Sequence, residues 1–419
     1  MNILIIGRGG REHAIAWKAA QSPLTTHLYI APGNDGMRSI QNVPVELVPI
    51  DEQDSDALVA FAREHAVDLT IVGPEAALIN GIADRFQEAG LTIFAPTTKA
   101  ARIEGSKQFA KDLMIKYNIP TATFRIFDQY EEAAAYLKEV GAPIVIKYDG
   151  IAAGKGVVVA MTEEEADQAL RDMLLDHNFG DGKVLMEEFL QGPEFSLLTL
   201  VNEHQVVPLV IAQDHKRAFD GDKGPNTGGM GAYSPVPVIP QEQIDWAVKH
   251  IMLATADAMM AEGCPFTGIL YGGLMLTKQG PKVIEFNARF GDPETEVVLP
   301  KMKSDLIQHI LDLLAHKPVT PEFYEEAFLG VVMAAKGYPG KYGKGFPIHN
   351  LDQVSQTIFH MGTKMKDGEC VSNGGRVLFV VGKGKNLAEA QKDAYEGVHK
   401  IACPELFYRE DIGWQAIEN

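Results

Sequence analysis

The sequence has 419 residues, which is enough for two to four domains at roughly 150 residues each. Its 38 Lys and Arg residues against 56 Asp and Glu give a formal net charge of −18, which argues against a binder of nucleic acid or anionic membranes, because such partners require a dense basic face. With 46% hydrophobic and 22% charged residues, the chain has the composition of a globular protein rather than a disordered one.

The three cysteines are widely spaced, which disfavours a disulfide framework and a thiolate zinc site. The N-terminal apolar run is only four residues long and no basic region precedes it, so we expect no signal peptide. No apolar stretch approaches the roughly 20 residues of a membrane span. We therefore expect a cytoplasmic enzyme with no nucleic-acid or membrane partner, and no obligate protein partner is evident.

The first hundred residues alternate between short apolar strands and amphipathic helices. This alternation predicts a parallel α/β sheet, in which ligands bind beyond the carboxyl ends of the strands. The expected strands are 2–6, 27–31, 46–50, 69–72 and 92–95, and the expected helices are 11–20, 54–66 and 76–89. Two glycine turns, Gly7–Gly10 and Gly73–Glu75, follow strands of this sheet.

From about Gly105 the pattern changes to α+β. We expect helices at 107–117, 131–140 and 163–176, and strands at 123–127, 143–148, 157–160 and 183–189. A polar loop at 214–233, a helix at 241–262 and strands at 268–277 and 282–287 should follow. The last ninety residues are predicted to form short strands and one helix, 386–401.

The turn at Gly7–Gly10 lies between a strand and a helix, where unpaired N–H groups favour an anion. It departs from the dinucleotide fingerprint, because Glu12 occupies the last glycine position and no acidic residue closes the second strand. A nicotinamide dehydrogenase is therefore a weak interpretation. A small-anion site is preferred over a tight turn without a ligand.

A glycine-rich turn at 149–156 joins two apolar strands and includes Lys155. Such a hairpin can fold over phosphates, and it is not a Walker loop because a strand follows it. Lys147 ends the preceding strand, where a buried cation requires an anionic partner. The segment from Glu187 to Leu190, with Glu194, could present backbone groups to an adenine edge and a carboxylate to a ribose.

Glu285 and Asn287 lie two residues apart on a predicted strand, so they face the same way, with Ile284 and Phe286 packed behind them. Two hard oxygen ligands suit Mg²⁺ or Mn²⁺ with phosphate oxygens and water. Arg289 follows within a loop that adds two more acids, and its guanidinium can bind a carboxylate or a phosphate.

These features together resemble the ATP-grasp superfamily. More narrowly, four motifs resemble the phosphoribosylamine–glycine ligase family: GGREH at 9–13, GPE at 73–75, PNTGGMG at 225–231 and RFGDPE at 289–294. The sequence departs from the family at Glu296, where glutamine is usual, so a local hydrogen bond could change or a charge could be added. It also has no carboxylate on strand 270–276, where many ATP-grasp enzymes place a metal ligand.

The resemblance implies a domain of 1–104 with a parallel sheet, a two-lobed ATP-grasp core of 105–328 with a lid lobe near 121–190, and a small α+β domain of 329–419. It implies that ATP and glycine form a glycyl phosphate, which the amine of 5-phosphoribosylamine attacks to give glycinamide ribonucleotide, a step of purine synthesis. We expect the lid lobe to close over these labile species.

The implied site residues fall into four groups. ATP is expected to be held by Lys107, Lys147, Lys155, Glu187, Glu188, Phe189, Leu190 and Glu194. The metal is expected at Glu285 and Asn287. Arg289, Lys155 and Asp292 are the expected catalytic residues. The substrates are expected at Gly9, Gly10, Glu75, Asp214, Lys216, Gly229, Met230 and Arg289, with Arg289 and the backbone of 228–231 holding the glycine carboxylate.

Two rival functions follow from the same residues. A different carboxylate–amine ligase or a carboxylase would share the ATP site and differ in the first and last domains. A non-catalytic nucleotide-binding regulator would share the scaffold, but the presence of Lys155, Glu285, Asn287 and Arg289 argues against it.

Overall fold

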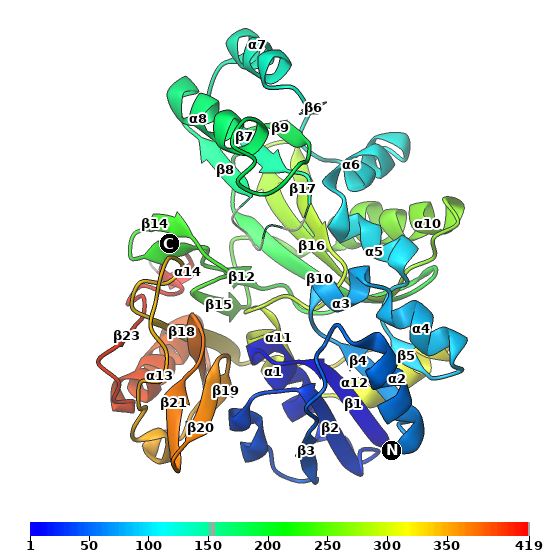
Figure 1. The fold of residues 1–419 in the computed structure, drawn as a ribbon, viewed down its shortest axis with the longest axis vertical. Helices are drawn as coiled ribbons and strands as arrows, with labels where there is room; N and C mark the ends of the chain where they lie inside the picture. Colours follow the sequence, from blue (N-terminus) through cyan, green and yellow to red (C-terminus); the bar gives the residue numbers. More distant parts are fainter. Residues whose placement is uncertain (151, 153–155, 418–419) are drawn as a thin grey trace.

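The computed structural model describes residues 1–150, 152 and 156–417, and Figure 1 shows their arrangement. The N-terminal sheet is parallel, as predicted, with strand order β3-β2-β1-β4-β5. Its strands are β1 (Asn2–Gly7), β2 (His27–Pro32), β3 (Val45–Leu47), β4 (Leu69–Val72) and β5 (Ile93–Phe94). Its helices are α1 (Gly10–Ala19), η1 (Asp35–Ser39), α2 (Ser55–Glu64), α3 (Glu75–Ile79) and α4 (Ile82–Glu88).

One predicted helix of this domain, 76–89, is two helices. The chain breaks between α3 and α4 at Gly81, whose φ of 89° lies in the left-handed region that glycine adopts without a steric penalty. Two further helices, α5 (Thr98–Gly105) and α6 (Lys107–Lys116), lead from this domain into the core.

The lid lobe carries the antiparallel sheet β6-β9-β7-β8 and stands apart at the top of Figure 1. Its elements are β6 (Phe124–Phe127), α7 (Tyr130–Val140), β7 (Ile144–Tyr148), β8 (Val157–Ala160), α8 (Glu163–Leu174) and β9 (Val184–Glu188). The buried apolar residues of this lobe form a hydrophobic cluster of their own. By contrast, the clusters beneath the other sheets combine residues from the N-terminal, core and C-terminal parts.

The core sheet is antiparallel, in the order β11-β10-β16-β17. Its strands are β10 (Glu194–Asn202), β11 (Gln205–Pro208), β16 (Thr267–Thr277) and β17 (Gly280–Asn287). The nearby helical segments are α9 (Gln241–Ala247), the π-helical η2 (Val248–Leu253), α10 (Ala254–Ala261), α11 (Thr295–Lys301) and α12 (Leu306–Leu314). The register of β16 and β17 shifts so that Gly273 pairs with Glu285 and Leu274 with Val283, which leaves Ile284 as a bulge.

The polar segment 214–233, expected to be a loop, contains strands. A small hairpin of β13 (Arg217–Phe219) and β14 (Lys223–Asn226) lies within it, and β12 (Gln213–Asp214) and β15 (Gly231–Ser234) flank the hairpin. Both β12 and β15 belong to the sheet of the C-terminal domain, in the order β12-β15-β18-β22-β19, because β15 pairs with β18.

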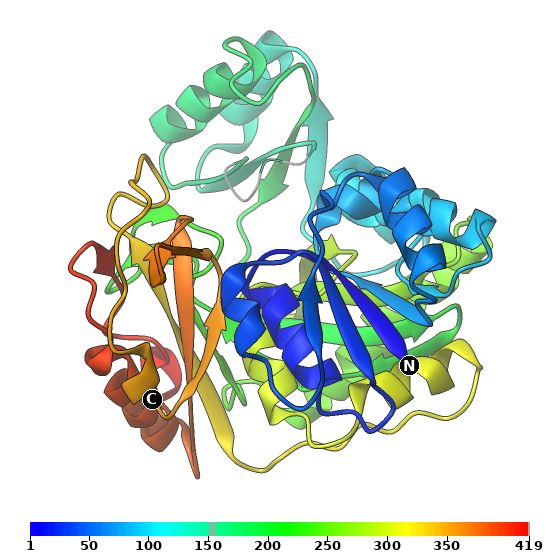
Figure 2. The same cartoon turned by 60° about the horizontal axis from the view of Figure 1, so that its bottom comes forward.

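The remaining C-terminal elements complete that sheet and cover it. They are β18 (Ala327–Ala335), η3 (Leu351–Gln353), β19 (Thr357–His360), β20 (Thr363–Lys366), β21 (Glu369–Ser372), β22 (Arg376–Gly384), α13 (Leu387–Lys400), β23 (Leu406–Phe407) and α14 (Trp414–Ile417). Figure 2 shows the C-terminal sheet beside the N-terminal domain. Among the described helices, none is long and apolar enough to cross a bilayer.

Candidate functional site

A cavity of about 400 Å³ lies where the N-terminal domain, the core, the lid lobe and the C-terminal domain meet. Many of the predicted site residues line it: Glu75, Lys107, Lys147, Glu187, Asp214, Lys216, Glu285, Asn287, Arg289 and Asp292. Other predicted residues are absent from its described lining: Gly9, Gly10, Glu188, Phe189, Leu190, Glu194, Gly229 and Met230. Lys155 lies outside the described residues.

Glu187 is buried between two lysines. Its carboxylate lies 2.8 Å from Lys147 Nζ and 3.1 Å from Lys111 Nζ, and all three side chains are at most 5% exposed. Burial raises the pKa of Glu187, but the two ammonium groups outweigh it and the pKa is lowered. The carboxylate thus neutralises lysines, so the residue cannot also turn its oxygens to a ribose without releasing them.

Lys147 also donates to the backbone carbonyl of Ile284 at 2.9 Å. Ile284 is the bulged residue of β17, so its carbonyl is free of the ladder and turns to the lysine. Its side chain was expected to pack behind the strand, but Ile284 lines the cavity. The bulge therefore fixes the ammonium of Lys147, a lid residue, to the core strand that carries Glu285 and Asn287.

Glu285 and Asn287 lie on the cavity side of β17, and both line the cavity. Burial raises the pKa of Glu285, but Lys216, Lys147, Lys107 and Arg289 outweigh it and lower the pKa, so the group is an anion at neutral pH. With its amide oriented to satisfy both ends, Asn287 donates to Glu104 Oε1 at 3.1 Å. Within the described part of the chain, no cluster of three His, Cys, Asp or Glu side chains forms a metal cage.

Asp214 and Lys216, on the strand β12 and just after it, line the cavity together. Lys216 Nζ lies 3.1 Å from Glu194 Oε2, and Glu194 is the first residue of β10. Burial, followed by the charges of Glu294 and Glu194, raises the pKa of Asp214 to about 7 despite the opposing effect of Lys216. A carboxyl group with this pKa can exchange a proton near neutral pH.

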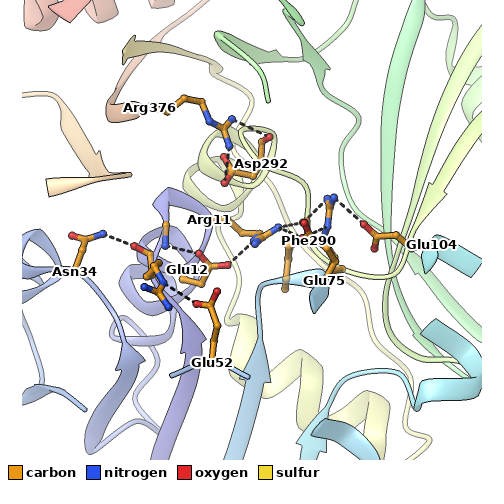
Figure 3. A network of polar contacts seen from close by, with 12 residues as sticks. Arg11, Glu12, Asn34, Glu52, Glu75, Glu104, Phe290, Asp292 and Arg376 are labelled. Atoms are coloured by element: carbon orange, nitrogen blue, oxygen red, sulfur yellow. Dashed lines mark hydrogen bonds and ion pairs between the residues drawn. The ribbon is translucent and has the colours of Figure 1, made fainter. Parts of the chain in front are cut away.

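Arg289 is held between two carboxylates, Glu75 and Glu104, which are labelled in Figure 3. Its Nη2 lies 3.0 Å from Glu104 Oε1 and its Nε lies 3.4 Å from Glu75 Oε2. Arg11 lies 3.9 Å from the same Glu75 oxygen, so Glu75 is shared by two guanidinium groups. The residues thus form an alternating row of charges at the edge of the cavity.

Arg376 is a cavity residue that sequence reasoning missed. Its guanidinium lies 3.2 Å from Asp292 Oδ2 (Figure 3). It also donates to the backbone carbonyls of Gly228, at 2.8 Å, and Gly229, at 3.3 Å. It comes from β22 in the C-terminal domain. The glycine pair Gly374-Gly375 before it was the available signal, because glycines allow close backbone approach to a neighbouring segment.

The glycine turn of the N-terminal domain is occupied by the protein's own carboxylate. Glu12 accepts from the backbone N–H of Gly9 at 2.7 Å, and it fills the space between Gly7 and Gly73. A Cβ at Gly73 would lie 1.8 Å from Glu12 Oε1. The crevice between β1 and β4, where a parallel sheet of this order binds ligands, is thus closed by Glu12 at the base of α1.

Three family models match the chain in succession. They are the N domain (residues 1–104), the ATP-grasp domain (105–295) and the C domain (328–415) of phosphoribosylglycinamide synthetase. These matches agree with the fold class predicted from the sequence, including the ATP-grasp core.

Curated relatives match over their whole length. The phosphoribosylamine–glycine ligase of Halalkalibacterium halodurans is 56% identical, with 100% of this chain and 97% of that protein covered. The enzyme of the same name from Escherichia coli K12 is 52% identical, with 100% and 99% covered.

Solved structures give the same result. The crystal structure of phosphoribosylamine–glycine ligase from Thermotoga maritima has a TM-score of 0.86 at 33% identity, covering 99% of this chain and 100% of that one. The biotin carboxylase domain of Hydrogenobacter thermophilus 2-oxoglutarate carboxylase, with a TM-score of 0.71 at 15% identity over 97% of this chain and 91% of that one, shares the fold. The chain therefore belongs to the phosphoribosylglycinamide synthetase family of ATP-grasp proteins.

Proposed function

We propose that this protein uses ATP to join glycine to 5-phosphoribosylamine, giving glycinamide ribonucleotide, ADP and phosphate. The observation that carries the proposal is the cavity itself. Lysines from the core and lid lie on it together with arginines from all three domains, and Glu285 and Asn287 also line it. Because the reaction combines two anionic substrates with a carboxylate, it needs cations on more than one side. The unpaired cysteines support a reducing cytoplasm.

Lys107 and Lys147 are assigned to the phosphates of ATP, with Lys155 of the glycine-rich turn as a third. Burial lowers the pKa of Lys107, while Glu285 opposes this effect, so the two groups favour each other's charged forms. The backbone of 188–190 is assigned to the adenine edge and Glu194 to the ribose. In this arrangement Glu187 acts through Lys147, which it neutralises and orients, rather than on the nucleotide directly.

The residues present fit a Mg²⁺ or Mn²⁺ ion carried in with the nucleotide. Glu285 is an ionised hard ligand, and Asn287, whose nitrogen faces Glu104, turns its amide oxygen the other way. One carboxylate and one amide supply few ligands, which suits an ion whose remaining ligands are phosphate oxygens and water. Such an ion would neutralise charge on the transferring phosphoryl group.

The substrate groups are assigned to the other side of the cavity. Arg289, with the backbone of 228–231, holds the glycine carboxylate, and Asp292 lies beside it on the same loop. Glu75, Asp214 and Lys216 hold the phosphoribosylamine. The turn at Gly9 and Gly10, which was expected to contribute, is left out because Glu12 takes the N–H of Gly9. Arg376 adds a cation that the sequence did not predict, and it orders the glycine run by binding two of its carbonyls.

The reaction follows from these positions. A glycine carboxylate oxygen attacks the γ-phosphorus of ATP, so the glycyl phosphate forms as ADP leaves. The amine then attacks the acyl carbon, phosphate leaves, and the amine nitrogen loses a proton. Asp214 is assigned to accept this proton, because it lines the cavity and its pKa of about 7 suits a base at neutral pH.

The acyl phosphate must be shielded from water, which we assign to closure of the lid lobe. The lobe has its own hydrophobic cluster, so it can move without unpacking the rest of the molecule. It is tied to the core where Thr121 pairs with Val283 and donates to its carbonyl at 2.8 Å. This tie is expected to be the pivot.

The test is ADP release with glycine labelled with ¹⁸O in its carboxylate. The expected result is ADP formation that requires both substrates, with one ¹⁸O recovered in each phosphate released. Phosphate without label would contradict the glycyl phosphate. ADP release with another acid or amine in preference to these would favour the rival ligase, and nucleotide binding with no ADP release would favour the regulator.

A further inference from the structure

Glu296 is an acid buried without a cation of its own. It is the second residue of α11 and is 0% exposed, and neither of its carboxyl oxygens has a hydrogen-bond partner. A Cβ at Gly10 would lie 2.7 Å from Glu296 Oε1 and 2.8 Å from Met361 Cγ. The carboxyl group is thus packed at the start of α1, close to the C-terminal domain.

The charged group with the largest effect on Glu296 is another acid. Asp292, on the loop before α11, has an orphaned oxygen, Oδ1, that is buried in the same way. Its other oxygen, Oδ2, lies 3.2 Å from Arg376 of β22. Arg11, on α1, interacts with the charge of Asp292 but does not pair with Glu296. Its hydrogen bonds go to the Glu12 carboxylate and the backbone carbonyl of Phe290.

Two neighbouring carboxylates in a buried site resist ionising together, because each disfavours the charge of the other. Burial, followed by the charge of Asp292, raises the pKa of Glu296 well above its usual value. The charge of Arg376 acts in the opposite direction with a smaller effect. A single proton between the two acids would satisfy the orphaned oxygen of Asp292.

We propose that Glu296 is held as the neutral carboxylic acid and donates its O–H to Asp292 Oδ1, which makes it the positioning residue of Asp292. Arg376 holds the other oxygen of Asp292, so the carboxylate is fixed from both sides. The expected addition of a charge at this position therefore does not occur at neutral pH, and the acid does the work of an amide donor. The consequence for catalysis rests on the proposed function, whereas the protonation state of Glu296 is independent of it.

The proton is tested without an activity assay, by infrared spectra of the parent protein and of Glu296→Gln at pH 7. The parent is expected to show the carbonyl band of a buried protonated carboxyl that Glu296→Gln lacks. The matched control is Glu325→Gln at an exposed site, which should leave that band unchanged. Equal spectra of the parent and Glu296→Gln in this region would overturn the proposal.

Stability gives a second reading of the same proton. In the folded parent Glu296 keeps its proton, whereas in the unfolded chain it releases the proton above about pH 4.3. Raising the pH above that value therefore favours unfolding. Relative to Glu296→Gln, the unfolding constant of the parent should rise about tenfold per pH unit above that point, up to the raised pKa. If the ratio of the two unfolding constants stayed the same across pH 5–8, the proposal of a neutral Glu296 would be contradicted.

The positioning role is tested by the pH profile of ADP release. Turnover by the parent should fall on the alkaline side, as Glu296 ionises beside Asp292, and Glu296→Gln should lack this fall because an amide donor does not titrate. Identical alkaline falls in the two proteins would overturn the positioning role. If the parent released no ADP at any pH, the proposed function would fail, while the infrared and stability results would still decide the state of Glu296.

Discussion

The Glu187 carboxylate lies 2.8 Å from the Lys147 ammonium, and both side chains are buried where the lid lobe meets the core. Lys111 of α6 approaches the same carboxylate from the core side and also donates to Thr121 Oγ1 at 2.7 Å. Glu187 therefore fixes one lysine of the lid lobe, Lys147, and one lysine of the core, Lys111. Because two cations share it, the cluster keeps a positive charge for an anionic ligand.

Replacing Glu187 with Gln should leave two buried lysines without an anion. Breaking a buried ion pair in this way costs about 3–5 kcal/mol, so the thermal midpoint should fall. Added ATP should recover part of the loss, because its phosphates replace the missing charge. Glu188→Gln is the matched control, since the neighbouring side chain is exposed, accepts from Thr123 and lies 4.0 Å from Lys282 Nζ at the surface. An equal midpoint in the two variants would contradict the charge argument.

Glu285→Ala should abolish metal-dependent ADP formation, because it removes the ionised ligand on β17. A loss of at least roughly a hundredfold in turnover is expected if the ion stabilises transferring charge. Raising the Mg²⁺ or Mn²⁺ concentration should restore activity in part. The exposed Glu325→Ala serves as the control. ADP release at the parent rate would exclude Glu285 as a metal ligand.

Arg289→Ala should raise the glycine requirement far more than the ATP requirement. A charge-assisted hydrogen bond to a carboxylate contributes about 1.5–3 kcal/mol, so the KM for glycine should rise roughly tenfold to hundredfold. Arg289→Lys keeps the charge but loses the planar fork, and it should fall between the parent and Ala. Arg63→Ala on the exposed face of α2 is the control. A shift confined to ATP would place Arg289 on the nucleotide instead.

Asp214→Asn should remove a proton acceptor. Turnover by the parent is expected to rise as pH increases through about 7, where Asp214 ionises, and this rise should be absent in the variant. The maximum rate should fall by roughly 10² to 10⁴, the usual contribution of general base catalysis. Asp245→Asn, at an exposed position of α9, is the control. A variant with the parent profile would show that another group takes the proton.

His360→Asn should make the protein less sensitive to acid. His360 is buried against the N-terminal domain, where its backbone N–H donates to His13 Nδ1 at 2.8 Å, and burial lowers its pKa to about 4. As pH falls from about 6.5 toward 4, the unfolded chain gains a proton that the folded state refuses, so stability is lost.

By pH 5 this single histidine accounts for about 2 kcal/mol of lost stability. The variant should therefore lose less stability than the parent between pH 7 and pH 5, as measured by denaturant unfolding at each pH. His316→Asn, at an exposed position with a positive φ that Asn tolerates, should keep the parent slope. A parent-like slope in His360→Asn would show that this histidine does not set the acid sensitivity.

Local sequence was sufficient where an element depends on its own residues. The strands β4 and β8 begin and end as predicted: the apolar run of β4 lies between Asp68 and Gly73, and that of β8 begins after Gly156. The segment 214–233 could not be read in this way, since β15 pairs with β12 and with β18, and β18 lies about a hundred residues later in the chain. Its polar, glycine-rich composition favours a loop until that partner is known.

The same distinction holds for the cavity. Glu285 and Asn287 were found because alternation on one strand places them together. The pairing of Glu187 with Lys111 and Lys147 joins three separate elements, so no spacing in the sequence reveals it. Arg376 reaches the loop at 228–229 from almost 150 residues away in the sequence. An arginine after two glycines does not indicate which segment its side chain contacts.

The strands β12 and β15 are contributed by one domain and hydrogen-bonded into the sheet of another. A cut near residue 328 would strip β18 of a neighbour and leave it as a bare edge, open to pairing with other chains. The C-terminal domain is thus continuous in the sequence, but its sheet is complete only with strands from the preceding domain. Exchanging the C-terminal domain between family members would require transplanting the segment 213–234 with it, since that segment supplies two strands of its sheet.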